Sequence, residues 1–176
     1  GDIEALLRLE TDLLFYLGFT GLERRKIFQH VPYAKMTDYL GVKEITAEHE
    51  EWIWKKFGYN AFFLKYFPQY TSPFWNMKKV KDYANKVDVI LYGMETIGSA
   101  ERSTDPEEMR YLFHTISDGM YAEELYKKLG KERIEHALEL FLSLPMITRC
   151  GGGIGMTRMI RAFKCAGIMP SFSSYK

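Results

Sequence analysis

The sequence has 176 residues, of which 47% are apolar and 15% aromatic, enough for one domain with a sizeable core and too apolar for a disordered chain. Its 24 basic and 23 acidic residues give a formal net charge of +1, so no overall basic field indicates nucleic-acid binding. No apolar run approaches membrane-span length, no secretory leader is recognisable, and two cysteines form at most one bridge. We therefore expect a single cytoplasmic domain over residues 1–176, without membrane contact.

Helical patterns dominate the first third of the chain. Leucines recur on one face of residues 3–17, which predicts an amphipathic helix. Thr37 and Thr46 are candidate N-caps, and the second opens a helix predicted over residues 47–57. Between the helices, the basic stretch of residues 23–26 is interpreted as a solvated connector, with contact to tRNA or an acidic partner as the alternative.

Strands are predicted in the middle of the chain. Four short segments there are rich in aromatic and β-branched residues or are bounded by glycine or proline. They cover residues 61–67, 74–77, 87–91 and 94–100. The Tyr92-Gly93 pair between the last two predicts a hairpin.

The remaining sequence predicts further helices. Asp105, followed by Pro106 and by Glu108 at the third helical position, is a helix start. That pattern continues to residue 129 with an interruption at residues 118–119, and a second helix is expected over residues 131–144. A last helix ends near Phe163. The fold class is therefore α+β, with an antiparallel sheet flanked by helices.

A glycine-rich segment lies just before the last helix. Its members are Gly151, Gly152, Gly153 and Gly155, and Arg158 follows in the first turn of the helix. A backbone without Cβ atoms lets a ligand approach closely, and an arginine at a helix N-terminus can pair with a phosphate. The segment is neither a P-loop nor a dinucleotide-binding fingerprint, because the required lysine and the alternating strands and helices are absent. A purely structural strand-to-helix turn is the alternative.

A second constellation repeats at intervals of seven residues. Asp88 and Glu95 lie on the two strands of the predicted hairpin, and Arg102 follows. A hairpin can bring both carboxylates to one face, where they would suit Mg²⁺ bound to a nucleoside triphosphate. An arginine beside them could bind a carboxylate or amide in bidentate fashion. The alternative interpretation is a charge pattern on exposed strand faces.

Three segments resemble one known family. Residues 151–159, Gly-Gly-Gly-Ile-Gly-Met-Thr-Arg-Met, resemble motif 3 of the class II aminoacyl-tRNA synthetases. Residues 88–102 resemble the aspartyl/asparaginyl branch, whose pattern is Asp, four residues, Gly, any residue, Glu, and Arg seven positions later. Residues 73–77, Pro-Phe-Trp-Asn-Met, resemble a substrate-flanking strand of that branch. The glycine segment is also similar to the ammonia-dependent asparagine synthetases, which share the fold.

The resemblance implies a role for each matching position. Arg158 would be the catalytic residue that binds the γ-phosphate of ATP, and the four glycines and Glu95 would complete the ATP site. Asp88 and Glu95 would hold Mg²⁺. Arg102 and Ser99 would bind the substrate, aspartate or asparagine. Glu101 stands where the family usually has glutamine, which would bring a negative charge next to an anionic substrate.

The function implied is activation of aspartate or asparagine to an aminoacyl adenylate for tRNA charging, by a homodimer. The ammonia-dependent ligase reaction is one alternative, and a non-catalytic synthetase-derived fragment or regulatory module is another. Motifs 1 and 2 of the family have no counterpart in these residues. We therefore expect the C-terminal portion of a class II synthetase-like catalytic domain, with an incomplete sheet, or a diverged relative.

Overall fold

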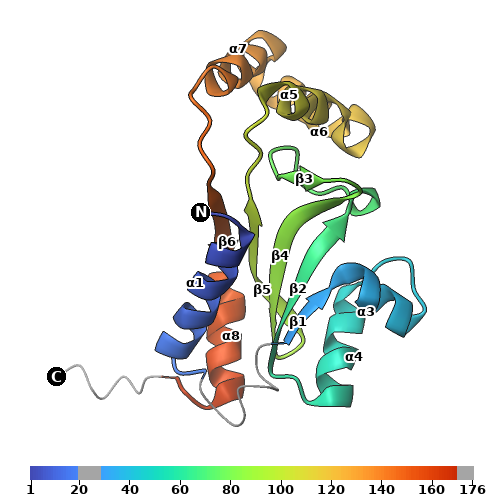
Figure 1. Ribbon diagram of the computed structural model, residues 1–176, viewed down its shortest axis with the longest axis vertical. Coiled ribbons are helices and arrows are strands. Elements are labelled where there is room, and N and C mark those ends of the chain that lie inside the picture. The colour runs from blue at the N-terminus through green and yellow to red at the C-terminus, as the bar shows by residue number, and fades with distance from the viewer. Residues whose placement is uncertain (20–28, 170–176) are drawn as a thin grey trace, which may run out of the picture.

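A six-stranded sheet organises the chain, which the computed structural model describes over residues 1–19 and 29–169 (Figure 1). The strand order is β1-β2-β4-β5-β6, and β3 pairs with β4 off this path. Strands β1 and β2 are parallel, whereas the other pairs are antiparallel. The strands span Gln29–Pro32 (β1), Ala61–Pro68 (β2), Lys79–Val80 (β3), Tyr83–Leu91 (β4), Met94–Glu101 (β5) and Cys150–Ile154 (β6). The predicted α+β class is confirmed.

Helices surround this sheet. They span Ile3–Tyr16 (α1), Tyr33–Leu40 (α3), Ala47–Phe57 (α4), Pro106–Thr115 (α5), Met120–Leu129 (α6), Lys131–Leu142 (α7) and Met156–Ala166 (α8), with short 3₁₀ turns at Gln69–Thr71 and Ile116–Gly119. Within the described ranges, no helix combines the length and apolar character that crossing a membrane requires.

The sheet has a different helical layer on each face, and a third group of helices lies at one end (Figure 1). Helices α1 and α8 pack over Val87, Val89 and Ile97. Helices α3 and α4 pack over Phe62 and Ile90. Helices α5, α6 and α7, which lie between β5 and β6 in the sequence, form a core of their own. Alternation along β2 and β4 therefore divides the apolar side chains between two cores.

An extra residue in β5 sets the faces of the hairpin. Val89 pairs with Ile97, whereas the next residue of β4, Ile90, pairs with Glu95, so Thr96 is unmatched. This bulge resets the alternation of β5. Glu95 and Gly98 therefore both lie on the α3/α4 face, and Gly98 is directly opposite Asp88.

The helix-start predictions are mostly confirmed. Asp105 caps α5 by accepting hydrogen bonds from the amides of residues 107 and 108, and Thr46 forms a capping box with His49 at the start of α4. The predicted interruption before α6 coincides with the 3₁₀ turn. Thr37 is wrong as an N-cap, because it lies inside α3 and its hydroxyl donates to the carbonyl of Ala34. The basic stretch of residues 23–26 lies outside the described residues.

The strand predicted over residues 74–77 is also wrong. This segment is a turn, and only Met77 forms a bridge, with Arg102. Trp75 leaves the sheet and packs edge-on against Phe113 and Phe141 in the core of the helical group. Burial of its large indole surface outweighs the β propensity of the aromatic residues in this segment.

Gly152 is required for packing within the sheet. A Cβ atom there would lie 2.5 Å from Ser99 Cβ and 2.6 Å from the carbonyl oxygen of Gly98. At Gly151, by contrast, no described atom lies within 4 Å of the Cβ position. Two glycines that are neighbours in sequence therefore have different functions.

We predict that Gly152→Ala lowers the free energy of unfolding by about 2 kcal/mol or more, because β6 must move away from β5. Gly151→Ala is the matched control and should change stability by less than about 0.5 kcal/mol. Urea unfolding followed by circular dichroism measures both. Equal effects of the two substitutions would contradict the packing role of Gly152.

Glu10 is an ionisable residue buried between α1 and the sheet. The residue is 4% exposed, and its Oε2 has no hydrogen-bond partner among the described residues. Burial raises the pKa of Glu10 from 4.5 to about 7, a hydrogen bond from Ser99 opposes this, and the charge of Asp88 adds to it. The folded chain therefore binds this proton more tightly than the unfolded chain.

The pKa of Glu10 is higher in the folded chain than in the unfolded chain. The stabilisation that protonation of Glu10 contributes is therefore complete below pH 4.5 and is lost as pH rises toward about 7. The loss should be on the order of 2 kcal/mol. We predict that Glu10→Gln, which keeps the shape without the charge, flattens the dependence of unfolding free energy on pH. Urea titrations at several pH values across this range test the prediction, and an unchanged slope would contradict it.

Candidate active site

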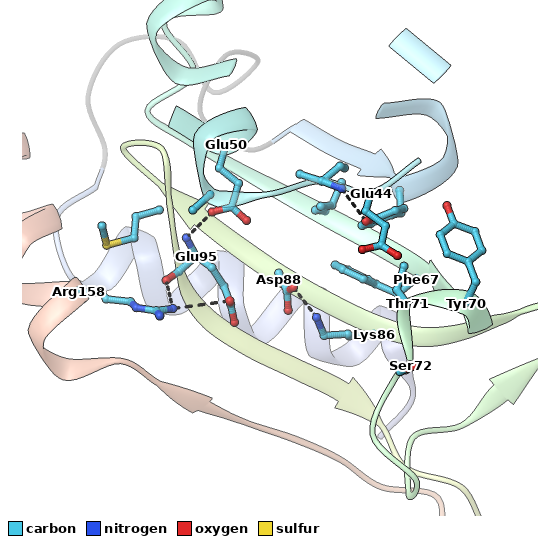
Figure 2. Close-up of a pocket in the computed structure, with 15 residues that line it drawn as sticks. Glu44, Glu50, Phe67, Tyr70, Thr71, Ser72, Lys86, Asp88, Glu95 and Arg158 are labelled. Atoms are coloured by element: carbon cyan, nitrogen blue, oxygen red, sulfur yellow. Dashed lines mark hydrogen bonds and ion pairs between the residues drawn. The ribbon is translucent and has the colours of Figure 1, made fainter. Parts of the chain in front are cut away.

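A cavity of about 570 Å³ opens on the α3/α4 face of the sheet (Figure 2). Its walls come from β2, β4 and β5, from the start of α3, from α4 and the segment before it, from the 3₁₀ turn after β2, and from the first turn of α8. The charged residues lining it are four acids and two bases: Glu44, Glu50, Asp88, Glu95, Lys86 and Arg158. An acidic surplus of this kind favours cationic groups on a ligand, or a metal ion bound with it.

Asp88 and Glu95 converge above Gly98. A Cβ atom on Gly98 would lie 2.9 Å from Glu95 Oε1 and 3.6 Å from Asp88 Oδ1, so both oxygens face the space that this glycine leaves open. Asp88 is 5% exposed, and its Oδ1 has no hydrogen-bond partner in the described part of the chain. The two carboxylates predicted from their spacing therefore share one face.

Lys86 holds the other oxygen of Asp88. The two residues lie on the same face of β4, and Lys86 Nζ is 2.5 Å from Asp88 Oδ2. The same ammonium lies 3.7 Å from the ring centroid of Phe67, a cation–π contact. Figure 2 shows Lys86 beside Asp88, on the side away from Glu95.

Burial shifts two acids of this site, Asp88 and Glu50, toward neutrality. It raises the pKa of Asp88 to about 6, with a further increase from Glu95, while Lys86 opposes the shift. Burial also raises the pKa of Glu50 to about 7, and the charges of Glu95 and Asp88 add to the effect. Removing these carboxylates from water is therefore costly without cations nearby.

Glu50 connects α4 to the site. Its Oε2 accepts a hydrogen bond of 3.0 Å from the backbone N–H of Glu95, so the helix helps to fix the residue at the bulge. Sequence reasoning missed Glu50, since it lies in the charged pattern of an amphipathic helix and belongs to no motif. Its role depends on how α4 packs across β5, which the sequence does not encode locally.

Arg158 lies at the mouth of the cavity, in the first turn of α8. Its Nη1 donates to the carbonyl oxygen of Glu95 at 2.9 Å and lies 3.6 Å from Glu95 Oε2. Half of the side chain is exposed, so the guanidinium can still meet a ligand. The predicted arginine and one predicted acid are thus adjacent, although 63 positions separate them in sequence.

The four glycines divide by function. Gly151 and Gly153 have no described atom within 4 Å of their Cβ positions, and Gly153 pairs with Gly98, so it faces the side of Asp88. Gly152 packs on Ser99 on the other side, and Gly155 contacts the stem of Arg158. A ligand could therefore approach the protein backbone closely at Gly151 and Gly153.

The predicted substrate residues lie differently. Arg102 is not among the residues lining the cavity; its Nη1 donates to Asn76 Oδ1 and its Nη2 to the carbonyl oxygen of Gly151. Ser99 is 2% exposed, and its hydroxyl donates to the carbonyl oxygen of Val87 at 3.4 Å on the face covered by α1, so it does not reach the cavity.

Glu101 points to the same covered face as Ser99. Its carboxylate is 2% exposed and accepts hydrogen bonds from Lys78 Nζ and Asn85 Nδ2. The negative charge of Glu101, which the sequence predicted next to the substrate, is therefore paired with Lys78 on the face of the sheet opposite the cavity. The expected effect of Glu101 on an anionic substrate is wrong for this reason.

Solved structures of class II synthetases are similar to this chain, and three of them illustrate the range of the match. Aspartyl-tRNA synthetase from Entamoeba histolytica is 22% identical with a TM-score of 0.57, and the match covers 80% of this chain and 29% of that chain. Asparaginyl-tRNA synthetase from Pyrococcus horikoshii, complexed with asparaginyl-adenylate, is 17% identical with a TM-score of 0.67, and the match covers 93% of this chain and 42% of that chain. Asparaginyl-tRNA synthetase from Entamoeba histolytica, also in complex with asparaginyl-adenylate, is 16% identical with a TM-score of 0.61, and the match covers 91% of this chain and 38% of that chain. The chain thus spans less than half the length of each. A comparison with curated protein sequences gave no match.

The sequence itself matches a family model. The match extends over residues 5–165, so it includes most of α1, all of α4, the hairpin, the glycine segment and all but the last residue of α8. Together with the shared fold, this match places the chain among the class II tRNA synthetases of the D, K and N group.

Proposed function

We propose that this domain takes part in the activation of aspartate or asparagine by ATP and Mg²⁺, which gives an aminoacyl adenylate. The observation that carries the proposal is the gathering of Asp88, Glu95 and Arg158 around one cavity. Two of the similar solved structures contain asparaginyl-adenylate, which supports the same chemistry. The activity is proposed for a catalytic domain of which these residues form a part, with tRNA as acceptor in a cytoplasmic homodimer.

The charged groups have complementary tasks in this reaction. The α-carboxylate of the amino acid would attack the α-phosphorus of ATP in line, and pyrophosphate would leave. Arg158 would pair with the γ-phosphate and offset the charge that develops on the leaving group. Gly151 and Gly153 would leave room for the adenosine.

The donor set of Asp88 and Glu95 fits Mg²⁺. The buried Oδ1 of Asp88, which has no partner in the described part of the chain, and the Oε1 of Glu95 are hard oxygen ligands that face one space. Mg²⁺ is usually held by one or two carboxylates together with substrate phosphates. When bound, it would screen the negative charge of the phosphates.

Arg102 is proposed to bind the side chain of the substrate. Its contacts to Asn76 and Gly151 use one hydrogen on each terminal nitrogen. A second hydrogen remains on each, because a guanidinium carries five donors. The guanidinium is therefore oriented and still able to donate to the carboxylate of aspartate or the amide oxygen of asparagine. Ser99 is not part of this proposal, because its side chain lies on the other face of the sheet and its strand is paired on both sides.

We predict that Arg158→Ala weakens binding of Mg²⁺-ATP by on the order of 1.5–3 kcal/mol, the contribution of a charge-assisted hydrogen bond. This corresponds to roughly a 10- to 100-fold increase in Kd. Calorimetric titration measures the change, and Arg133→Ala, an exposed arginine of α7, is the matched control. An affinity unchanged by Arg158→Ala would contradict its proposed role.

A second titration identifies the substrate. Non-hydrolysable analogues of aspartyl- and asparaginyl-adenylate should bind saturably, with preference for one of them. Failure of the folded chain to bind ATP and both analogues would contradict the proposal. In a complete catalytic domain, amino-acid-dependent pyrophosphate exchange and transfer to tRNA would support charging, whereas release of asparagine from aspartate and ammonia would support the ligase alternative.

A further inference from the structure

Lys86 is a cation inside the proposed metal site that belongs to none of the motifs in the sequence. Arg158, the other base of the cavity, lies at its mouth with half of its side chain exposed. The side chain of Lys86 is 23% exposed and comes from the floor of the cavity, two residues before Asp88 on the same strand. Its charge is therefore a fixed part of the site.

Two contacts hold the ammonium in place. Its Nζ is 2.5 Å from Asp88 Oδ2 and 3.7 Å from the centroid of the Phe67 ring. The ring attracts the ammonium through its negative face, and the carboxylate neutralises its charge. Rotating the lysine away would leave Asp88, which is 5% exposed, without its cation.

The two oxygens of Asp88 consequently have different surroundings. Oδ2 is taken by Lys86, whereas Oδ1 has no partner among the described residues and faces the space shared with Glu95 Oε1. A divalent cation between Oδ1 and Glu95 would lie on the opposite side of the same carboxylate from the ammonium. The two positive charges would repel each other across one small anionic group.

We propose that Lys86 is an internal counter-cation that weakens the binding of a divalent cation to Asp88 and Glu95 when no nucleotide is present. The metal then enters the site mainly with a triphosphate, whose negative charges offset the repulsion. This second step rests on the proposed function, whereas the effect of Lys86 on the bare metal does not.

The test measures Mn²⁺ binding to the nucleotide-free chain through the electron paramagnetic resonance signal of free Mn²⁺. We expect Lys86→Met, which keeps the length and apolar contact of the side chain, to lower the Kd for Mn²⁺ at least tenfold. Lys86→Arg keeps the charge and should bind Mn²⁺ as the unaltered chain does. Lys79→Met, at an exposed lysine of β3 outside the cavity, is the matched control.

A further variant locates the gained site. Adding Asp88→Asn to Lys86→Met should remove the gain, because the metal would lose its anionic ligand. Circular dichroism checks that each variant is folded, and Lys86→Gln replaces Lys86→Met if the latter is not. The proposal is overturned if the neutral variant binds Mn²⁺ no more tightly than the unaltered chain, if Lys86→Arg gains as much, or if the gain survives Asp88→Asn.

Addition of ATP separates this inference from the proposed function. If ATP does not promote Mn²⁺ binding by the unaltered chain, the nucleotide role of the site fails. The counter-cation role of Lys86 is tested by the nucleotide-free Mn²⁺ titrations alone.

Discussion

Burial of the Asp88 carboxylate is the constraint on which the rest of the site depends. The residue is 5% exposed on a sheet face that also contains Phe62 and Ile90. A carboxylate in such a place costs several kcal/mol unless cations or hydrogen-bond donors offset the loss of water. Among residues 1–19 and 29–169, Lys86 supplies that offset, and it does so at one of the two oxygens. The other oxygen retains its capacity to accept a ligand, and the cavity is built around it.

The neighbouring elements keep the second oxygen accessible. Gly98 stands opposite Asp88 and adds no side chain, and the bulge at Thr96 brings Glu95 to the same face while Ile97 stays in the α1/α8 core. Without the bulge, Ile97 would be the residue opposite Asp88 and would fill the space above it. The hairpin thus satisfies a packing requirement on one side of the sheet and an electrostatic requirement on the other.

Local chemistry explains which parts of this arrangement could be predicted. Capping at Asp105, the hairpin at Tyr92-Gly93 and the glycine turn into α8 depend on residues close in sequence, and these predictions hold. The position of Trp75 depends on three distant helices, so the predicted strand around it fails. Glu50, Lys86 and the orientation of Ser99 were missed because each follows from packing or from the bulge. Motif spacing identified charges on the proper strands but not which neighbours neutralise them.

The helical group α5–α7 has a further consequence, which follows from where it joins the sheet. Residues 103–148 leave after β5 and return before β6, and the amide of Arg102 donates to the carbonyl of Arg149 at 2.8 Å where the two paths meet. Figure 1 shows this group beyond the end of the sheet, away from α4 and α8. Because this hydrogen bond joins the two ends of the insertion, segments within residues 103–148 can be added, lost or exchanged without changing the register of β5 and β6. The outer contacts of the helical group can therefore change during evolution without altering the candidate active site.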